Sequence, residues 1–337
     1  MAKLGLVAIG RNEGERLKRC LESVVGRADC VVYVDSQSTD GSVELARSMG
    51  VEVVELDPSK PFASPRSRNE GFNRLMEVAP ELEYVQFVDG DCELVDGWLE
   101  RGVRELDQRP DIAIVSGRRQ EKFPEVSVYN RLADMEWDTP IGEVKYCHGD
   151  AMMRVKAFQQ VGGFLSTLIG GGEPELCVRI RREGWKILRV DAPMTWHDAD
   201  IHRFGQWWRR NVRVGHAYAE GSWLHGRSPD KHWVKESRSI WFWGLVLPLI
   251  SLAMVWPSQG WSLLLLLSYP AQILKILVRM QSQGTSFQNA FLYAWTCVVA
   301  KFPLVQGHLK FHWNRLQGKN TKLVEYKDVK AVASVDS

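Results

Sequence analysis

The sequence has 337 residues, which is enough for one large domain or two ordinary ones. Its 43 basic side chains nearly balance 41 acidic ones, so the net charge of +2 gives no support for a nucleic-acid-binding protein. The six cysteines are scattered without a C-x-x-C pair, which argues against a disulfide framework or a zinc site and favours a reducing compartment.

The first 90 residues alternate short apolar runs with segments of helical spacing. We predict strands over Leu4–Ile9, Val31–Val34, Val51–Leu56 and Tyr84–Val88, and helices over Glu15–Val25, Ser42–Met49 and Arg66–Val78. Strands separated by helices of this length predict right-handed crossovers and a mainly parallel sheet. Ligands bind such sheets beyond the carboxyl ends of the strands, where this chain carries charged residues.

Asp89-Gly90-Asp91, directly after one of these strands, is the most informative local feature. Two carboxylates one residue apart on a tight turn suit a hard divalent cation that also holds a phosphate. Gly90 would let a diphosphate approach the backbone. Taken alone the D-x-D pattern is common, and a solvated acidic turn is the alternative interpretation.

From Ile240 to Val305 the sequence becomes apolar and rich in Trp and Leu. Ile240–Trp256 carries no charge and would span about 26 Å as a helix, and Pro257–Gly260 predicts a turn before two further apolar runs, 261–277 and 287–305. Basic clusters lie before the first run and after the second and third. The positive-inside rule then favours a two-helix membrane hairpin and a third, interfacial or re-entrant segment. The alternative is a helical hairpin buried in a large soluble core.

Several ordered motifs resemble those of the family 2 glycosyltransferases, of the membrane-anchored bacterial type. They are LVAIGRNEGERLKRCLESV, VVYVDSQSTDGS, SRNEGFN, VQFVDGD, CHGDAMMRVKAFQQVGGF, GGGEPELCVRIRREGWKI and MTWHDADIHRFGQWWRRNVRVGHAY. The resemblance covers roughly residues 4–220. It implies an α/β GT-A fold, Rossmann-like with a mainly parallel sheet and flanking helices, and inverting transfer of a sugar from a nucleotide diphosphate. C-terminal transmembrane or interfacial helices complete the predicted fold.

The resemblance also implies where the donor binds. The implied donor-binding residues are Arg11, Glu13, Asp35, Arg68, Asp89 and Asp91. The nucleotide would lie against Asp35, and Arg68 would reach the diphosphate because guanidinium groups suit phosphate oxygens. The alternative for Asp35 is that it caps the following helix together with Asp40. Glu13 equally suits a charge at a helix N-terminus.

A metal site follows from the same resemblance. Asp91 would contact Mn²⁺ or Mg²⁺ directly, and Asp89 would bond the ribose or reach the metal through water. His197, after the predicted strand Trp185–Val190, is similar to a late histidine that approaches the metal in the family. A structural histidine is the alternative. The cation would stabilise the charge that develops on the departing diphosphate.

The family pattern for the catalytic base is a glycine, an acidic pair, one residue, another acid and an apolar residue. This chain has Gly171-Gly172-Glu173-Pro174-Glu175-Leu176, so Glu173 occupies the usual position of the catalytic Asp and Gly172 replaces the acid before it. We predict that Glu173 is the base. Glu175 would orient the acceptor or pair with an Arg. The alternative is that both glutamates only complement a helix dipole.

Gln206-Trp207-Trp208-Arg209-Arg210 resembles the Q-x-x-R-W motif of processive polysaccharide synthases except at its last position. The resemblance implies that Gln206, Trp208 and Arg209 cover the acceptor or the diphosphate, with Trp stacking on a sugar face. An amphipathic interfacial helix is the competing interpretation. The changed last residue favours addition of one sugar per encounter.

The sequence is therefore divided into a GT-A domain (1–220), a basic linker or interfacial segment (221–239), membrane helices (240–307) and a cytosolic tail (308–337). The predicted function is inverting, metal-dependent sugar transfer to a lipid-linked sugar or growing glycan, with the catalytic domain on the cytoplasmic side of the inner or plasma membrane. One alternative is a membrane scaffold that binds nucleotide sugars or glycans with a decayed site. A sugar-1-phosphate nucleotidyltransferase is disfavoured because a Gly-rich phosphate loop is missing near the N-terminus.

Overall fold

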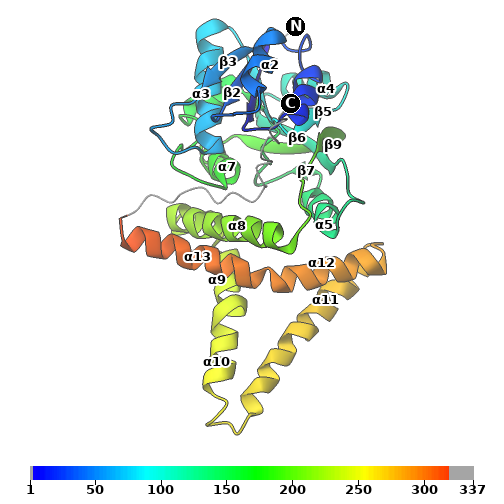
Figure 1. The fold of residues 1–337 in the computed structure, drawn as a ribbon, viewed down its shortest axis with the longest axis vertical. Helices are drawn as coiled ribbons and strands as arrows, with labels where there is room; N and C mark the ends of the chain where they lie inside the picture. Colours follow the sequence, from blue (N-terminus) through cyan, green and yellow to red (C-terminus); the bar gives the residue numbers. More distant parts are fainter. Residues whose placement is uncertain (1–2, 319–337) are drawn as a thin grey trace, which may run out of the picture. The chain divides into compact units, whose positions relative to one another are not determined.

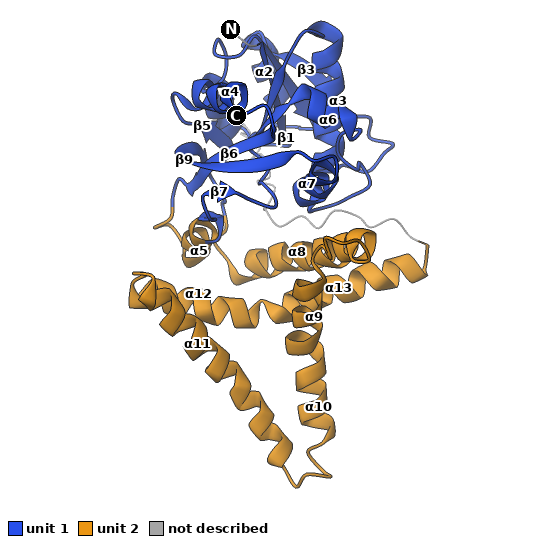
Figure 2. Cartoon of the chain, turned by 180° about the vertical axis from the view of Figure 1, so that it is seen from behind, with its two compact units in different colours: residues 1–123, 136–200, 327–337 blue, residues 124–135, 201–326 orange. Residues whose placement is uncertain are grey.

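The computed structural model describes residues 3–318, which form two compact units (Figures 1 and 2). Residues 3–123 and 136–200 belong to unit 1, and residues 124–135 and 201–318 belong to unit 2. Helix α8 (Phe204–His225) in unit 2 runs through the predicted domain boundary at residue 220. Of the predicted tail, 308–337, residues 319–337 lie outside the described part of the chain.

The first half of the unit 1 sheet confirms the predicted alternation. Its parallel strands are β1 (Leu4–Gly10), β2 (Cys30–Asp35), β3 (Glu52–Glu55) and β4 (Tyr84–Asp89). They are separated by α1 (Glu15–Glu22), α2 (Ser42–Ser48) and α3 (Ser64–Val78). β1 lies between β2 and β4, so the carboxyl ends of these three strands meet at one edge.

The second half of the sheet is mixed. It contains β5 (Cys92–Leu94), β6 (Ile112–Glu121), β7 (Gly142–Glu143), β8 (Met152–Arg154) and β9 (Lys186–His197). The strand order is β3-β2-β1-β4-β8-β6-β9-β5, and β7 pairs with β9. The short β8 runs antiparallel to both β4 and β6, whereas β6 and β9 are parallel. β8 therefore joins the parallel strands of the first half to the parallel pair β6 and β9.

Both faces of this sheet are buried in apolar clusters. Leu6 and Ala8 of β1 belong to the cluster on one face, and Val7 and Ile9 belong to the cluster on the other. In β4, Val88 belongs to the same cluster as Leu6, and Phe87 belongs to the same cluster as Val7. Strands covered on both faces read as continuous apolar runs, which is why they stand out in the sequence. The remaining helices of unit 1 are α4 (Trp98–Gln108), α6 (Val155–Gln160) and α7 (Gly172–Arg182), while α5 (Val128–Trp137) continues from unit 2 into unit 1.

Unit 2 is helical. After α8 come α9 (Val234–Trp241), the π-helical turn η1 (Phe242–Val246), α10 (Leu247–Ala253), the 3₁₀ segment η2 (Trp261–Leu267), α11 (Ser268–Ser282), α12 (Phe287–Val299) and α13 (Lys301–Leu316). α8 and α13 cross at glycines. A Cβ at Gly215 would lie 2.1 Å from the Leu304 carbonyl oxygen. A larger residue at this position would therefore keep the two backbones from approaching so closely.

α10 and α11 form a hairpin that extends away from α8 and α13 (Figure 1). The predicted turn before residue 261 is confirmed, with Gln259 and Gly260 at φ of 51° and 90°. Of the helices in the described residues, one, Trp261–Ser282, is long and apolar enough to cross a membrane, and only 6% of its apolar 18-residue window is buried. The predicted span 240–256 lies on a helical run without a break, formed by the end of α9, η1 and α10 up to Ala253, and the predicted third run is divided at Ala300 between α12 and α13.

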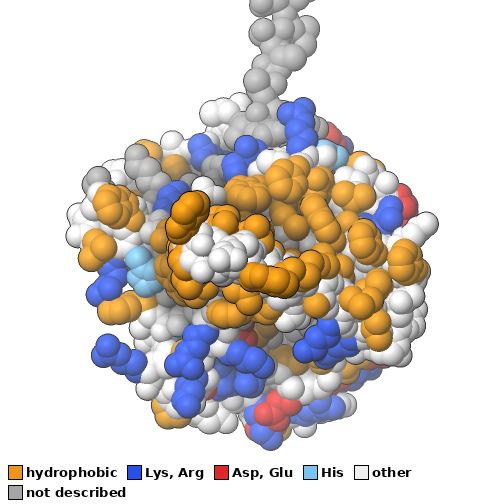
Figure 3. Space-filling model, turned by 90° about the horizontal axis from the view of Figure 1, so that it is seen from below, with side chains coloured by type: hydrophobic (Ala, Val, Ile, Leu, Met, Phe, Trp, Pro, Cys, Tyr) orange, Lys and Arg blue, Asp and Glu red, His pale blue; other side chains and the backbone are white. Residues whose placement is uncertain are grey.

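The surface of the hairpin is apolar. Figure 3, a view from below, shows hydrophobic side chains over its tip. The exposed ones include Leu249, Leu252, Trp256, Trp261, Leu264, Leu267, Leu274 and Val278. A contiguous apolar surface of this kind marks an interaction site for a membrane or a partner. The hairpin is not buried in a soluble core, which was the alternative interpretation of the sequence.

Candidate active site

The predicted donor residues lie at the shared edge of β1, β2 and β4 in unit 1. Gly10 of β1 is in register with Asp35 of β2, and Ile9 is in register with Asp89 of β4. Arg11, which follows β1, stacks its guanidinium carbon 5.5 Å from the Phe62 ring centroid. The three strands therefore bring together charged residues that are far apart in the sequence.

Asp35 is buried and holds the turn that follows β2. Its Oδ1 accepts a hydrogen bond from the Tyr33 hydroxyl (2.9 Å), and its Oδ2 accepts one from the Ser38 backbone N–H (2.7 Å). Burial, reinforced by the Asp35 charge, raises the pKa of Tyr33, so the phenol stays protonated as the donor. Asp40 accepts from the Ser42 backbone at the start of α2 (3.1 Å), as a capping residue does.

Gly90 within the D-x-D turn and Glu13 beside it have local structural contacts. Glu13 Oε2 lies 2.9 Å from the Arg16 Nε in the first turn of α1. A Cβ added at Gly90 would lie 3.1 Å from the Ile9 carbonyl oxygen and 3.3 Å from Glu13 Cγ. The glycine is thus explained by close packing against β1, and its predicted role in admitting a diphosphate stays a prediction.

Arg68, on α3, links the end of β4 to the start of α7. Its Nη2 donates to Asp89 Oδ1 (2.6 Å) and its Nη1 donates to Glu173 Oε1 (2.5 Å), although these residues are far apart in sequence. Burial alone would lower the pKa of Arg68, but Glu173 and Asp89 outweigh it and the pKa is raised. A Cβ at Gly149 would lie 2.5 Å from Nη2, so the glycine makes room for this guanidinium.

A second buried ion pair lies beside Asp89. Arg119 of β6 holds Asp150 with two bonds, Nε to Oδ2 at 2.6 Å and Nη2 to Oδ1 at 2.5 Å, and Asp150 also accepts from the Thr195 hydroxyl (2.8 Å). The same Nη2 lies 3.5 Å from Asp89 Oδ2. Burial would raise the pKa of Asp150, but Arg119 outweighs it and the pKa is lowered. For Asp89, burial outweighs Arg68 and its pKa is raised.

Sequence reasoning missed Arg119 and Asp150. Arg119 ends a run that begins as an apolar strand, Ile112–Glu121, and Asp150 lies in the CHGD stretch. His148, from the same stretch, was also missed. Burial, then the Arg119 charge, lowers the pKa of His148 to about 4, so its ring is neutral at physiological pH. The sequence did carry one signal for Arg119: charged residues follow the apolar first half of the strand Ile112–Glu121.

Asp91 and His197 meet because β5 pairs with β9. Their register places Cys92 opposite His197, and His197 Nε2 lies 3.5 Å from Asp91 Oδ2. The other ring nitrogen, Nδ1, lies 3.9 Å from Glu121 Oε2, and Trp137 packs edge-on against the ring at 4.6 Å. His197 is the last residue of β9, which is longer than the predicted strand 185–190.

The donor set fits a divalent cation. The possible ligand atoms of Asp91, Cys92 and His197 lie within 4.8 Å of one another, and so do those of Asp89, Cys92 and Asp150. Burial, then the Asp150 charge, raises the pKa of Cys92 well above its usual value, so the protonated thiol is a poor ligand. Asp150 is engaged by Arg119. This leaves Asp91 and His197 as candidate ligands in the first group and Asp89 alone in the second, and an imidazole beside a carboxylate suits Mn²⁺ better than Mg²⁺.

Glu173 stands in the first turn of α7, after Gly171 in the left-handed region at φ 74°. A Cβ at Gly172 would lie 2.7 Å from Pro65 Cγ of α3. The glycine that replaces the acid of the family pattern therefore has a packing reason. Glu175 is buried and pairs with Arg179 (2.7 Å), which was one of its two predicted roles.

Of the four residues predicted to contact the acceptor or the diphosphate, the three other than Glu175 lie on α8 in unit 2. Gln206 Oε1 accepts from the backbone N–H groups of His202 (2.8 Å) and Arg203 (3.0 Å), which caps the helix. Trp208 Nε1 donates to Gln306 Oε1 (2.8 Å), and Arg209 is exposed. The cap accounts for Gln206 within unit 2, and the acceptor role of all three residues stays a prediction.

Residues 7–162 match the family model described as Glycosyl transferase family 2, so this stretch is a family 2 glycosyltransferase domain. The chain is 24% identical to "Glycosyltransferase AglE" of Haloferax volcanii over 86% of this chain and 90% of that protein. It is 27% identical to "Succinoglycan biosynthesis protein ExoA" of Rhizobium meliloti over 52% of this chain and 55% of that protein.

Among solved structures, the mannosyltransferase PcManGT from Pyrobaculum calidifontis, in complex with GDP-Man and Mn²⁺, is similar with a TM-score of 0.57. The match has 17% sequence identity and covers 93% of this chain and 88% of that one. At this identity the likeness establishes the fold. Unit 1 has the predicted GT-A type of architecture, a mixed and mostly parallel sheet with flanking helices.

Proposed function

We propose that this chain, which carries a glycosyltransferase family 2 domain, is an inverting, metal-dependent transferase that moves a sugar from a nucleotide diphosphate to an acceptor at a membrane. The acceptor hydroxyl oxygen attacks the anomeric carbon as the bond from that carbon to the diphosphate oxygen breaks. Glu173 takes the hydroxyl proton, and the nucleoside diphosphate leaves. Attack opposite the leaving group inverts the anomeric centre.

One observation carries the proposal: a single guanidinium bonds both the carboxylate of the D-x-D turn and the predicted base. Because Arg68 contacts Asp89 at 2.6 Å and Glu173 at 2.5 Å, both carboxylates lie beside one guanidinium, with their bonded oxygens at most about 7 Å apart. A space of this size between a phosphate-binding carboxylate and a base suits one sugar ring. This separation supports our proposal of in-line displacement between the two groups.

Arg68 would change partners during the reaction. A diphosphate carries more negative charge than either carboxylate, and guanidinium groups bond phosphate oxygens in pairs. When the donor binds, Arg68 turns from Glu173 toward the diphosphate. Glu173 is then released to accept a proton from the acceptor hydroxyl.

Asp91, His197 and Asp89 would hold the cation, which supplies Lewis-acid stabilisation of the departing diphosphate. Glu121, 3.9 Å from His197 Nδ1, favours the tautomer that leaves the Nε2 lone pair directed at Asp91. Asp35 and Arg11, at the neighbouring strand ends, would face the nucleoside. The solved neighbour that contains GDP-Man and Mn²⁺ supports a donor and ion of these classes.

The acceptor side is inferred from unit 2 and from the relatives. The exposed apolar hairpin and the candidate span Trp261–Ser282 support association with a membrane. The relative named for succinoglycan biosynthesis supports a glycan or lipid-linked glycan as acceptor. With the catalytic unit in the cytosol, the donor comes from the cytosolic pool and the acceptor from the bilayer.

The test measures nucleoside diphosphate release from a panel of nucleotide sugars by the full chain in detergent with Mn²⁺. Glu173→Gln and Asp91→Ala each lower kcat by roughly 10²–10⁴-fold, because one removes the base and the other a cation ligand. Only Asp91→Ala loses Mn²⁺-dependent donor binding by calorimetry. The product anomer, read by NMR, has the configuration opposite to that of the donor.

Glu183→Gln is the matched control, because Glu183 is an exposed residue at the other end of α7. Its turnover stays within twofold of the wild type. Full turnover in Glu173→Gln, or a product that retains the donor configuration, would exclude Glu173 as the base of an inverting reaction.

A further inference from the structure

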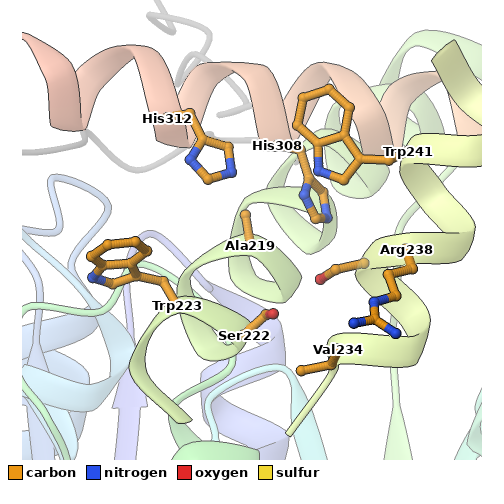
Figure 4. Close-up of a pocket in the computed structure, with 9 residues that line it drawn as sticks. Ala219, Ser222, Trp223, Val234, Arg238, Trp241, His308 and His312 are labelled. Atoms are coloured by element: carbon orange, nitrogen blue, oxygen red, sulfur yellow. The ribbon is translucent and has the colours of Figure 1, made fainter. Parts of the chain in front are cut away.

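Unit 2 contains a pocket that the proposed transfer reaction does not use. It has a volume of about 280 Å³ and lies among α8, α9 and α13 (Figure 4). Its lining includes Ser222 and Trp223 from α8, Arg238 and Trp241 from α9, and His308 from α13. Pockets for whole small molecules hold roughly 300–1,000 Å³, so this one suits a small head group better than a nucleotide sugar.

His308 indicates that the pocket takes a polar ligand. The residue is 1% exposed, and neither of its ring nitrogens has a hydrogen-bond partner. Buried polar groups are nearly always bonded, so two orphan nitrogens on one ring point to a partner that arrives from outside. Burial, then the neighbouring His312 and His216, lowers the pKa of His308 to about 4. The neutral ring offers one N–H donor and one acceptor at physiological pH.

The charge of the lining indicates an anion. The lining contains Arg238, and no carboxylate is part of it. Among the described residues none forms an ion pair with Arg238. A second cation, Arg315, lies with its guanidinium carbon 3.4 Å from the ring centroid of Trp223. Within the lining, Arg238, the Ser222 hydroxyl and His308 form a donor set for a ligand with several oxygens, as a phosphate has.

The apolar walls indicate that the phosphate carries an apolar chain. Trp223 and Trp241 line the pocket, and the chain continues from Trp241 directly into the exposed hairpin, beginning with Phe242 and Val246. A ligand with its phosphate beside Arg238 would lay its tail along these side chains. A metal ion is a poorer occupant, because in residues 3–318 His308 and His312 do not join a third ligand to form a possible metal-binding group.

We propose that this pocket binds the phosphate head group of a membrane lipid at the α9 end of the hairpin. The proposal rests on the membrane association inferred above, and it adds a lipid site that is separate from the sugar-transfer site. Arg238 supplies the charge, His308 and Ser222 supply hydrogen bonds, and the two indoles contact the first carbons of the lipid. A glycerophospholipid and an isoprenyl phosphate share this chemistry.

Native mass spectrometry of the full chain in a non-ionic detergent tests the site without any nucleotide sugar. The probes are dihexanoyl phosphatidylglycerol, geranyl phosphate, inorganic phosphate and the uncharged dihexanoylglycerol. We expect one saturable site for at least one of the two lipid phosphates and none for dihexanoylglycerol. The tighter of the two lipid phosphates identifies the source. Inorganic phosphate binding as tightly as either lipid would overturn the lipid assignment.

Arg238→Gln weakens lipid phosphate binding about tenfold, because it removes one charge-assisted hydrogen bond and its free energy corresponds to about that change in affinity. His308→Phe weakens it severalfold. Arg227→Gln, an exposed arginine of unit 2 outside the lining, changes it less than twofold. Equal binding by wild type and Arg238→Gln overturns the proposal, and because Arg238 is exposed this variant is expected to fold. Glu173→Gln binds lipid like the wild type, so failure of the transfer mechanism and failure of this site are distinguishable.

Discussion

Units 1 and 2 place their polar and apolar groups in opposite ways. In unit 1 the buried charges face one another, since Arg68 and Arg119 hold Asp89, Asp150 and Glu173. In unit 2 a buried imidazole, His308, has no hydrogen-bond partner, and large apolar side chains of the hairpin are exposed.

This difference indicates what each unit needs from its surroundings. A ligand of unit 1 must compete with internal ion pairs, so it must be strongly charged, as a nucleotide diphosphate with a cation is. The hairpin region of unit 2 is completed by an apolar medium and an anionic group, which a bilayer surface provides. The predictions below change one side of the comparison at a time.

The largest expected effect comes from breaking the charge matching of unit 1. Asp150→Asn removes the negative charge that pairs with the buried Arg119. Breaking a buried ion pair costs about 3–5 kcal/mol. The free energy of unfolding, from urea denaturation in detergent, should fall by this amount. Asp96→Asn, in an exposed pair with Arg27, should change it by less than about 1 kcal/mol. Equal effects of the two variants would show that the buried network does not hold unit 1 together.

A somewhat smaller effect is expected from a charge on the apolar surface of unit 2. Leu274 is exposed near the middle of the candidate span Trp261–Ser282, and a lysine near the centre of a membrane helix costs about 2.5–3.5 kcal/mol. Leu274→Lys should therefore lower binding to phosphatidylcholine vesicles roughly 50-fold or more in a flotation assay. Gln283→Lys, at the end of α11, is the control and should float like the wild type. Undiminished flotation of Leu274→Lys would mean that the hairpin does not enter the bilayer.

The fold of unit 1 was largely predictable because its signals are local. β1, β2 and β4 are buried on both faces, so they appear as continuous apolar runs, and Asp35 and Asp89 mark their carboxyl ends. The meeting of Asp91 with His197 was predicted only by resemblance. It depends on the pairing of β5 with β9, which brings together residues about a hundred positions apart.

The network around Asp89 could not be derived from local patterns. Asp150 reaches it because the three-residue strand β8 inserts between β4 and β6 with antiparallel pairing, and three residues carry too little periodicity to predict a strand. The lack of hydrogen-bond partners for the buried His308 ring was equally unpredictable from the sequence. It depends on how α8 and α13 cross at Gly215 and Gly307. Apolar content predicted the hairpin, but not the π-helical turn η1 within its first arm.

The pH dependence of the unfolding free energy tests the buried, unpartnered imidazole of His308 in unit 2. The folded pKa of His308 is about 4 and the unfolded value is near 6.5, so between these values the unfolded chain binds more protons. Stability therefore falls as the pH drops through this window, by about 2 kcal/mol at pH 5 for this one residue. His308→Phe should reduce the difference in unfolding free energy between pH 7 and pH 5 by that amount. An unchanged difference in His308→Phe would show that the ring is protonated in the folded state at pH 5.

The smallest effect tests whether the unit 1 site is completed by a cation. Glu121 is buried, and its oxygens accept from the backbone N–H groups of Phe123 (3.1 Å) and Ala199 (3.0 Å) while one of them lies 3.9 Å from His197 Nδ1. Glu121→Gln keeps the shape but removes the charge that orients the imidazole, so Mn²⁺ affinity should weaken about tenfold.

Electron paramagnetic resonance of free Mn²⁺, without donor, measures this affinity directly. Glu143→Gln, on the exposed edge strand β7, should bind Mn²⁺ like the wild type. Equal affinity in Glu121→Gln would mean that His197 does not contact the ion, because a ligand whose tautomer is freed loses affinity. The carboxylates of the D-x-D turn would then hold the cation without it, and the edge-on contact with Trp137 would be the structural reason for the histidine.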